Sequence, residues 1–493
     1  MSKKGSLFLL IKSLTKAEKR HFKLSLSGDV EGNNYLLLFN AIDAQEELDE
    51  EAIKKKFKQY TFSKQLHVTK NYLTKLILKS LRSYHAHITK DAELKDLLRE
   101  VEILFKKDLF DMCYYHLKKA EEMAIKYERH TALLDVYSWQ RRLTLTTETS
   151  FNAPTPVSEI LKKEAQTIQK VINLNEYWDL TVNQFSILSN REQIEQWKLK
   201  PAVTNPDYSL SLQAKMLHYY LNYTLNVVTA EPEKAGIASL NMIKLLEARP
   251  DRIKEDPNGY LTAIGNRLSL LIRSSSDADE IPELIIKAKN APAKYGLKHL
   301  SKGTIKLIAK TYNVEMEYYR DRKDFVKGII VAEETEQFIK QYHPTIPDDY
   351  KLLLSYQIAY ITFMSGQLRK SLTYLNSILN EVYDKQREDI QSFVRLLYLI
   401  IHFELGNIVV LKYSVESVRR FLKKKRTLYP YELILLKFFS KASTTPEEEY
   451  KYLLAQLKTD LFKPENSQNM DNALDYLDFK GWLESKKLFV SKN

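Results

Sequence analysis

The chain has 493 residues, of which 44% are hydrophobic and 28% are charged, and its formal net charge is +12. This composition is typical of a globular protein and excludes a disordered or a membrane-embedded chain. Glycine and proline are scarce, at 12 and 14 residues. Glycine-rich phosphate loops and turn-dense β folds are therefore nearly excluded, and long helices joined by short turns remain.

The single cysteine, Cys113, cannot form an internal disulfide and gives no sign of a secreted protein or of a structural zinc site. The apolar run from Leu7 to Ile11 is too short for a signal peptide, and no run reaches the roughly 18 apolar residues of a membrane-spanning helix. We therefore expect a cytoplasmic protein without membrane insertion.

Residues 1–90 are predicted to form a basic helical region, because they contain 17 lysines and arginines against 9 aspartates and glutamates. Thr15 and Glu18 predict a capping box at the start of one of its helices. Basic residues recur at helical spacing in two stripes. The first stripe is Lys16, Lys19 and Lys23, and the second is Lys75, Lys79 and Arg82. Lys70, which precedes the second stripe, is a further candidate. Such stripes are compatible with a helix-turn-helix-like module on a phosphate backbone, with an acidic protein partner, or with a merely solvated face.

Four stretches within 91–445 share one pattern: an apolar helix, a tight polar turn, an apolar residue, and a second helix. Small residues follow near the start of that second helix in the first three, and the four turns lie at 104–110, 319–325, 363–368 and 403–408. The apolar residues after three of these turns, Phe325, Leu368 and Ile408, are 43 and 40 residues apart. A small residue at that point allows two antiparallel helices to approach closely. The pattern predicts stacked antiparallel helix hairpins.

The segment 352–380 resembles the tetratricopeptide repeat family. Ala359 takes the place of the small residue in the first helix, Gly366 that of the turn glycine, and Ser371 that of the small residue in the second helix. The segment 97–122 resembles the family next best, although the family's tryptophan is missing and the period is nearer 40 than 34 residues. The resemblance implies an all-α, right-handed α-solenoid over 91–445, capped by helices in 446–493, and an array of independent hairpins is the alternative.

A solenoid of this kind implies a groove that binds a peptide or protein, and tyrosine is frequent enough, at 31 residues, to line one. Tyr219, Tyr318 and Tyr356 are the candidates for groove residues. The competing interpretation is that these tyrosines pack between helices, with each hydroxyl bonded to water or to a carbonyl group.

A second basic cluster fills six of eight positions at a predicted helix C-terminus: Arg419, Arg420, Lys423, Lys424, Lys425 and Arg426. The helix dipole favours cations there, but six like charges repel one another. Either a nearby acidic helix or an anionic partner is expected to offset this repulsion, and the sequence favours neither.

No motif predicts catalysis, a cofactor or a metal site. Dinucleotide, phosphate-loop, serine-hydrolase and zinc-protease signatures are missing from the sequence. His85 and His87 form the only close histidine pair, and a spacing of two directs them to different helix faces. We expect a non-enzymatic interaction or scaffold protein that binds a protein or peptide in its groove, with the basic N-terminal region on an acidic partner. The alternative is a regulator associated with nucleic acid, either on RNA or the ribosome or on DNA with a repeat sensor domain.

Overall fold

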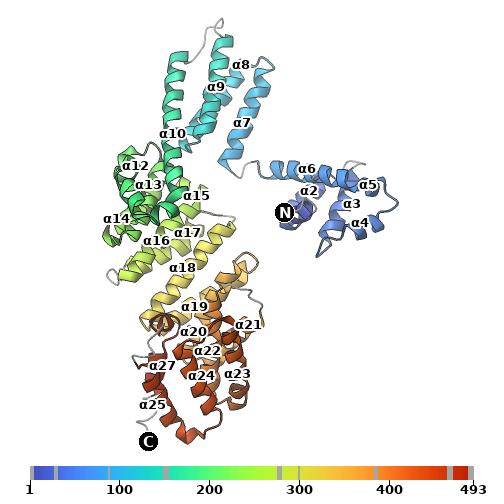
Figure 1. Ribbon diagram of the computed structural model, residues 1–493. Coiled ribbons are helices and arrows are strands. Elements are labelled where there is room, and N and C mark those ends of the chain that lie inside the picture. Colours follow the sequence, from blue (N-terminus) through green and yellow to red (C-terminus); the bar gives the residue numbers. More distant parts are fainter. Residues whose placement is uncertain are drawn as a thin grey trace. The chain divides into compact units, whose positions relative to one another are not determined.

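Figure 1 shows a computed structural model of the chain, which describes residues 5–26, 32–86, 89–147, 155–274, 280–297, 300–381, 387–463 and 470–486. The residues in these ranges form helices, turns and bends and no β-strand, so the predicted all-α class is confirmed for them. The chain divides into two compact units, residues 1–218 and 219–493. No helix among the described residues is long and apolar enough to cross a membrane.

The first unit begins with six helices around a hydrophobic cluster that includes Ile11, Phe22, Phe39 and Ile77. Helix α1 packs on α3, and α6 packs on α2, α3 and α5. The helices are α1 (Ser6–Ser13), α2 (Lys16–Ser25), α3 (Gly32–Asp43), α4 (Glu50–Lys56), α5 (Thr61–Lys64) and α6 (Leu66–Tyr84).

The predicted capping box at the start of α2 is present. The backbone N–H of Glu18 donates to Thr15 Oγ1 at 3.2 Å, and the backbone N–H of Thr15 donates to Glu18 Oε2 at 2.6 Å. Two N–H groups that the first helical turn cannot satisfy thus gain partners, which fixes where α2 begins.

The first unit continues with a group of longer helices around a second cluster, which includes Val101, Cys113, Val136 and Ile160. Each of α7 to α10 packs on the next. Between α11 and α13 the chain forms one short helix and one 3-10 turn. The elements are α7 (Lys90–Phe105), α8 (Phe110–Lys126), α9 (His130–Thr147), α10 (Val157–Leu188), α11 (Arg191–Lys198), α12 (Pro201–Thr204), η2 (Pro206–Tyr208) and α13 (Leu212–Val228), which crosses the boundary between the units.

In the second unit, alternate helices contact one another in succession: α14 with α16, α16 with α18, α18 with α20, α20 with α22, and α22 with α24. We call α16, α18, α20, α22 and α24 the A series; the helices between them pack beside them. The elements are α14 (Pro232–Glu247), α15 (Pro250–Glu255), α16 (Pro257–Ser274), α17 (Glu280–Lys294), α18 (Lys302–Asp321), α19 (Phe325–Tyr342), α20 (Asp348–Met364), α21 (Leu368–Asn380), α22 (Glu388–Glu404), α23 (Ile408–Lys425), α24 (Pro430–Ala442), η3 (Glu447–Glu449), α25 (Tyr450–Leu461), α26 (Met470–Tyr476) and α27 (Phe479–Ser485).

The four tight turns predicted from the repeat pattern share one geometry. Asp108, Lys323, Gly366 and Gly406 each adopt a positive φ, of 57°, 56°, 79° and 65°. The N–H of the residue after each one donates to the carbonyl five residues earlier, as Gln367 does to Thr362 at 2.9 Å. This is the Schellman end of a helix, in which a left-handed residue reverses the chain and satisfies free carbonyl groups.

The predicted close approach of paired helices is confirmed in two hairpins. Ser371 Oγ of α21 donates to the carbonyl oxygen of Ala359 in α20 at 2.6 Å. Cys113 Sγ of α8 donates to the carbonyl oxygen of Val101 in α7 at 3.6 Å. Both pairs are separated by 12 residues, and a larger side chain at either second position would force the helices apart.

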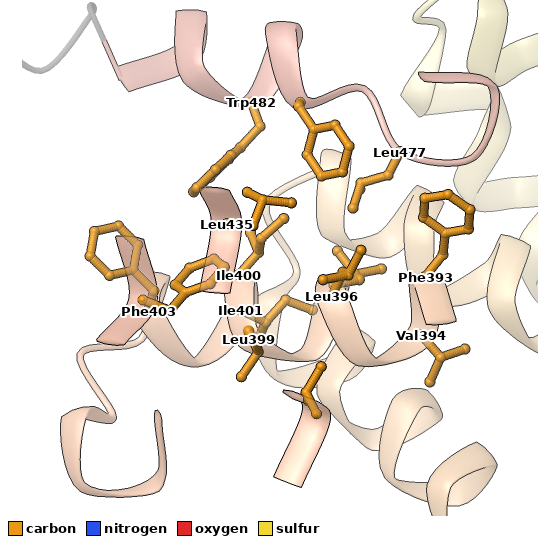
Figure 2. Packing of buried hydrophobic residues seen from close by; sticks show 14 of the residues in the cluster. Phe393, Val394, Leu396, Leu399, Ile400, Ile401, Phe403, Leu435, Leu477 and Trp482 are labelled. Carbon is orange, nitrogen blue, oxygen red and sulfur yellow. The ribbon is translucent and has the colours of Figure 1, made fainter. Parts of the chain in front are cut away.

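The largest hydrophobic cluster described lies in the second unit and combines α20 to α25 with α26 and α27. Figure 2 shows Leu477 and Trp482, from the C-terminal segment, packed on Phe393, Ile400 and Phe403 of α22. The segment predicted as a cap over 446–493 therefore contributes to the same core as the helices before it. The three sequence ranges, 1–90, 91–445 and 446–493, stay a prediction about domains.

Candidate functional site

Helices α26 and α27 lie against three successive members of the A series. On α20, Tyr356 donates its hydroxyl hydrogen to the carbonyl oxygen of Tyr476 at 2.9 Å, and Tyr360 Oη accepts from the backbone N–H of Asp478 at 3.3 Å. On α22, the ring of Phe393 stacks on that of Tyr476 with centroids 4.7 Å apart. Two tyrosines one turn apart thus bind the backbone that joins α26 to α27.

Trp482 anchors the other end of this contact. Its indole Nε1 donates to Glu404 Oε1 at 2.7 Å, and its ring lies 6.4 Å from those of Phe438 and Phe439 on α24. The side chain is 3% exposed, and Lys486 pairs with the other oxygen of Glu404. The chain's own C-terminal residues therefore fill this stretch of the A series (Figure 2).

This arrangement corrects the prediction that Tyr356 lines an open groove. Tyr356 is 1% exposed and its hydroxyl is bonded within the chain, so a ligand reaches it only if α26 and α27 leave. Tyr318 is also buried, with the guanidinium of Arg322 3.9 Å from its ring centroid. Tyr219 is half-buried in α13. Sequence spacing could not distinguish these packed tyrosines from groove tyrosines.

A polar cluster lies one step along the A series, between α18 and α20. Asn313 Nδ2 donates to Glu317 Oε1 at 3.0 Å, and Gln357 Nε2 donates to the same oxygen at 3.4 Å. Asn313 and Gln357 are 8% and 3% exposed, and Glu317 is half-buried. We call Asn313, Glu317 and Gln357 the Glu317 cluster.

The Glu317 cluster contains two buried acceptors that no described residue satisfies. Asn313 Oδ1 and Gln357 Oε1 have no hydrogen-bond partner within the described part of the chain. Rotating either amide would place its oxygen against the Glu317 carboxylate, so the carboxylate fixes both orientations. An unsatisfied buried acceptor costs about 1–3 kcal/mol, which makes such a pair unusual in a folded core.

Two guanidinium groups lie near the cluster, and each is paired with a carboxylate other than that of Glu317. Burial raises the pKa of Glu317 above its ordinary value, although the nearby positive charge of Arg320 acts in the opposite direction. Arg320 itself donates to Asp321 at 2.9 Å, and Arg387 donates to Asp389 at 2.9 Å. With both guanidinium groups paired, the remaining property of the cluster is a surplus of acceptor oxygens. It suits a ligand that presents N–H donors.

The sequence did not reveal this cluster. Asn313 and Gln357 are 44 positions apart, and each stands between two apolar or aromatic residues of its helix. Only the packing of α18 on α20 brings the two amides to one carboxylate. A sequence signal exists in hindsight, since a buried asparagine or glutamine inside an A-series helix is costly unless it is bonded.

The N-terminal basic residues divide into paired and exposed sets. Lys19 forms an ion pair with Asp43 at 2.6 Å, and Lys70 forms one with Glu50 at 2.5 Å. Lys23 lies over the ring of Phe39, 5.6 Å from its centroid. The exposed basic residues of the predicted set are Lys16 on α2, and Lys75, Lys79 and Arg82 on α6.

The C-terminal basic cluster is used in part by the chain itself. Arg426 donates through both terminal nitrogens to Glu432 at 2.8 Å, stacks on Tyr429 and satisfies a carboxylate that is 0% exposed. Of the two alternatives that the sequence left open, an acidic residue of the next helix is the one found at Arg426.

The other described members of that cluster form weaker contacts within the chain or are exposed. Arg419 lies 3.4 Å from Glu416, and Arg420 Nε donates to the carbonyl of the same residue at 3.4 Å. Lys423 and Lys424 are exposed. The side chain of Lys425 lies outside the described residues.

Groups suited to metal binding are not brought together among the described residues. No group of three or more histidine, cysteine, aspartate and glutamate side chains in these ranges could hold a metal ion. Burial raises the pKa of Cys113, which keeps the thiol protonated. His85 contacts Glu18 at 2.7 Å, and His87 lies outside the described residues.

Comparison with known proteins gives no relative: no family model matches the chain, no curated protein matches it, and no solved structure matches it. The likeness to tetratricopeptide repeats therefore rests on the hairpin residues described above.

Proposed function

We propose that this chain is a non-enzymatic helical-repeat interaction protein that binds a peptide segment of a partner at the Glu317 cluster. The observation that carries the proposal is the pair of buried amide oxygens, Asn313 Oδ1 and Gln357 Oε1, left without donors beside a carboxylate. A peptide backbone presents N–H groups at regular intervals and supplies the missing donors.

The neighbouring stretch of the A series supports this interpretation. There the hydroxyls of Tyr356 and Tyr360 bind the backbone of residues 476–478, so these helices already bind one peptide segment of the chain's own. The two amide oxygens are closed to solvent, and we expect the Glu317 side chain to rotate when a ligand enters. Binding is then coupled to a small local rearrangement.

We also propose that the second unit is a right-handed α-solenoid. Its support is the succession of contacts between alternate helices, together with the repeated Schellman turns. Stacked hairpins produce such contacts, because each repeat packs only on its neighbours. A rigid array of this kind binds with little loss of conformational entropy.

The test is selection of peptides from a random phage-displayed library on the full-length chain, followed by calorimetry with the selected peptides. Asn313→Leu and Glu317→Gln are expected to weaken binding about tenfold or more, since about 1.4 kcal/mol corresponds to each factor of ten. Val326→Ala, at an exposed position of α19, is the matched control and is expected to bind unchanged. Selected peptides that bind all three variants equally, or a failure to select any peptide, would refute the proposal.

A second candidate function, association with nucleic acid, is favoured by the exposed residues Lys75, Lys79 and Arg82 on one helix. Lys19 and Lys70 each form an ion pair, whereas none with a described residue is found for these three side chains. Contacts from such a stripe would be made to phosphate groups, either on RNA or on DNA. An acidic protein partner of this region, in a cytoplasmic setting, fits the first proposal equally.

Titration of the full chain with a mixed-sequence duplex DNA and with a structured RNA, each at several salt concentrations, tests the nucleic-acid hypothesis against that of an acidic protein partner. If the chain binds nucleic acid, the logarithm of the binding constant should fall linearly with the logarithm of the salt concentration. The slope should be roughly 0.7–0.9 for each phosphate contacted. The triple change of Lys75, Lys79 and Arg82 to Gln should then reduce that slope. Binding that ignores salt, or no binding at low salt, excludes this function.

A further inference from the structure

A cavity of about 1,210 Å³ lies among the C-terminal elements of the second unit. It is surrounded by the turn between α22 and α23, by η3 and α25, and by α27. None of the described residues that line it belongs to α18 or α20, so it is distinct from the Glu317 cluster. Small-molecule sites usually have volumes of roughly 300–1,000 Å³, so the cavity is large enough for an organic ligand.

Much of the lining of this cavity is apolar. Phe403 and Leu483 are buried, and Ile408, Tyr450 and Leu454 are half-buried. Apolar side chains that face an open cavity stay in contact with water, and a ligand that covers them removes their surface from water. Hydrophobic contact is therefore one attraction that the cavity offers to a ligand.

Helix α25 forms one wall of the cavity and has a lysine at each end of that wall. Its lining residues recur at helical spacing on one face, and they are Lys451, Leu454, Ala455, Lys458 and Thr459. Lys451 and Lys458 are seven residues apart, which is roughly 10 Å along the helix axis. The wall thus presents an apolar surface between two positive charges.

The charges that line the cavity leave a single positive charge in excess. The lysines are Lys451, Lys458 and Lys486, and the carboxylates are those of Glu404 and Glu447. Lys486 pairs with Glu404, whereas no ion pair with a described residue is found for Lys451 or Lys458. A ligand with one negative charge would therefore neutralise the lining, and a cationic ligand would be repelled.

The hydroxyl groups of the lining already donate their hydrogens within the chain. Thr445 donates to the carbonyl oxygen of Lys441 at 2.9 Å, and Thr459 donates to that of Ala455 at 3.1 Å. Tyr450 donates to the carbonyl oxygen of Ala442 at 3.1 Å. A ligand rich in polar groups, such as a sugar, would lose hydrogen bonds to water here without replacement. An alkyl chain loses none.

We propose that this cavity binds an aliphatic carboxylate, with its alkyl chain on the apolar lining and its carboxylate held by the lysines of α25. The apolar residues account for the chain, and the single positive charge in excess accounts for a monoanionic head group. The bonded hydroxyl groups account for the absence of further polar groups from the ligand. This site does not depend on the peptide site at the Glu317 cluster.

The apolar part of the proposal is tested by calorimetry of the full-length chain with octanoate, decanoate and dodecanoate, each below its critical micelle concentration. Affinity should rise with chain length by up to about fourfold for each CH₂ group, because burial of one CH₂ contributes about 0.8 kcal/mol and about 1.4 kcal/mol corresponds to a factor of ten. Equal affinities for the three alkanoates, or no binding of any of them, would overturn the proposal.

The double change of Lys451→Gln and Lys458→Gln tests the head group. This variant should bind decanoate about tenfold more weakly than the wild type and should bind decanol, which has no charge, equally well. The matched control is the double change of Lys437→Gln and Lys441→Gln, because both are exposed lysines of α24 outside this cavity. An undiminished affinity for decanoate in the first variant, or an equal loss for decanol or in the control, would contradict recognition by Lys451 and Lys458.

Ala455→Phe tests the location of the site. Ala455 is an exposed residue that lines the cavity, so a phenyl ring there occupies the cavity without disturbing the core. Decanoate and decanol should both bind this variant several-fold more weakly, while its urea denaturation curve matches that of the wild type. If both ligands bind it as they bind the wild type, they bind elsewhere and the proposal is wrong.

Discussion

Two stretches of the A series, one over α20 to α24 and one between α18 and α20, treat their polar groups differently. In the first, Tyr356, Tyr360 and Glu404 each bond to the C-terminal helices. In the second, the oxygens of Asn313 and Gln357 have no partner among the described residues. Among the described residues, the chain's own C-terminal helices therefore satisfy the polar groups of the first stretch and leave those of the second without partners.

Trp482→Ala tests whether the C-terminal helices cover the stretch from α20 to α24, and it is expected to have the largest effect. Removing a ring that is 3% exposed should lower the free energy of unfolding by about 3–5 kcal/mol, and Glu404 loses a donor as well. Urea denaturation followed by circular dichroism measures the change. Tyr452→Ala, at a residue that is 76% exposed, should change stability by no more than about 0.5 kcal/mol. If both variants behave alike, the C-terminal helices do not close this stretch.

Arg426→Met tests whether the chain uses its basic cluster internally. The substitution leaves the fully buried carboxylate of Glu432 without its two charged donors, so we expect a loss of about 2–3 kcal/mol. Arg420→Met removes an exposed cation of the same cluster and should cost less than about 0.5 kcal/mol. Equal effects of the two substitutions in urea denaturation would mean that the Glu432 pair contributes nothing special.

Acid should weaken the covered stretch through His402 of α22. Burial lowers the pKa of His402 below 6.5, so the unfolded chain takes up a proton at a higher pH than the folded chain. The contribution of His402 to the free energy of unfolding is therefore complete above pH 6.5 and is lost as the pH falls through the folded-state pKa. Over that range the free energy of unfolding should fall by at most about 1.4 kcal/mol per pH unit. His402→Gln should remove this part of the slope in denaturation experiments repeated across pH. An unchanged slope would show that His402 does not titrate differently on folding.

The smallest effect on stability is expected for Gln357→Met, which tests the stretch between α18 and α20. The substitution keeps the length of the side chain and removes an unsatisfied buried oxygen together with a long 3.4 Å hydrogen bond. Stability should change by less than about 1 kcal/mol in either direction, while affinity for the selected peptides falls. A large loss of stability with full affinity would assign Gln357 to folding alone.

The hairpins could be predicted from the sequence because their determinants are local. The turn glycine Gly366, the small residue Ser371 and the apolar residue Leu368 lie within a few positions of one another, and the backbone geometry they require is specific. The capping box at Thr15 is equally local. Short-range steric and hydrogen-bonding rules therefore carry most of the helical fold.

The candidate site could not be predicted, because its determinants are separated by long stretches of chain. Tyr356 meets the carbonyl of Tyr476 over 120 positions, and nothing in the spacing of tyrosines signals such a contact. Lys19 and Lys70 belong to predicted basic stripes, yet each meets a carboxylate from a different helix. A stripe shows which side chains share a face and leaves open what packs against that face.

The central claim, that a partner peptide binds at the Glu317 cluster, is tested most directly by hydrogen–deuterium exchange of the full-length chain with and without a selected peptide. The peptide is expected to slow exchange in α18 and α20, around Asn313, Glu317 and Gln357. Protection confined to α6 or to α23, with α18 and α20 unchanged, would contradict it.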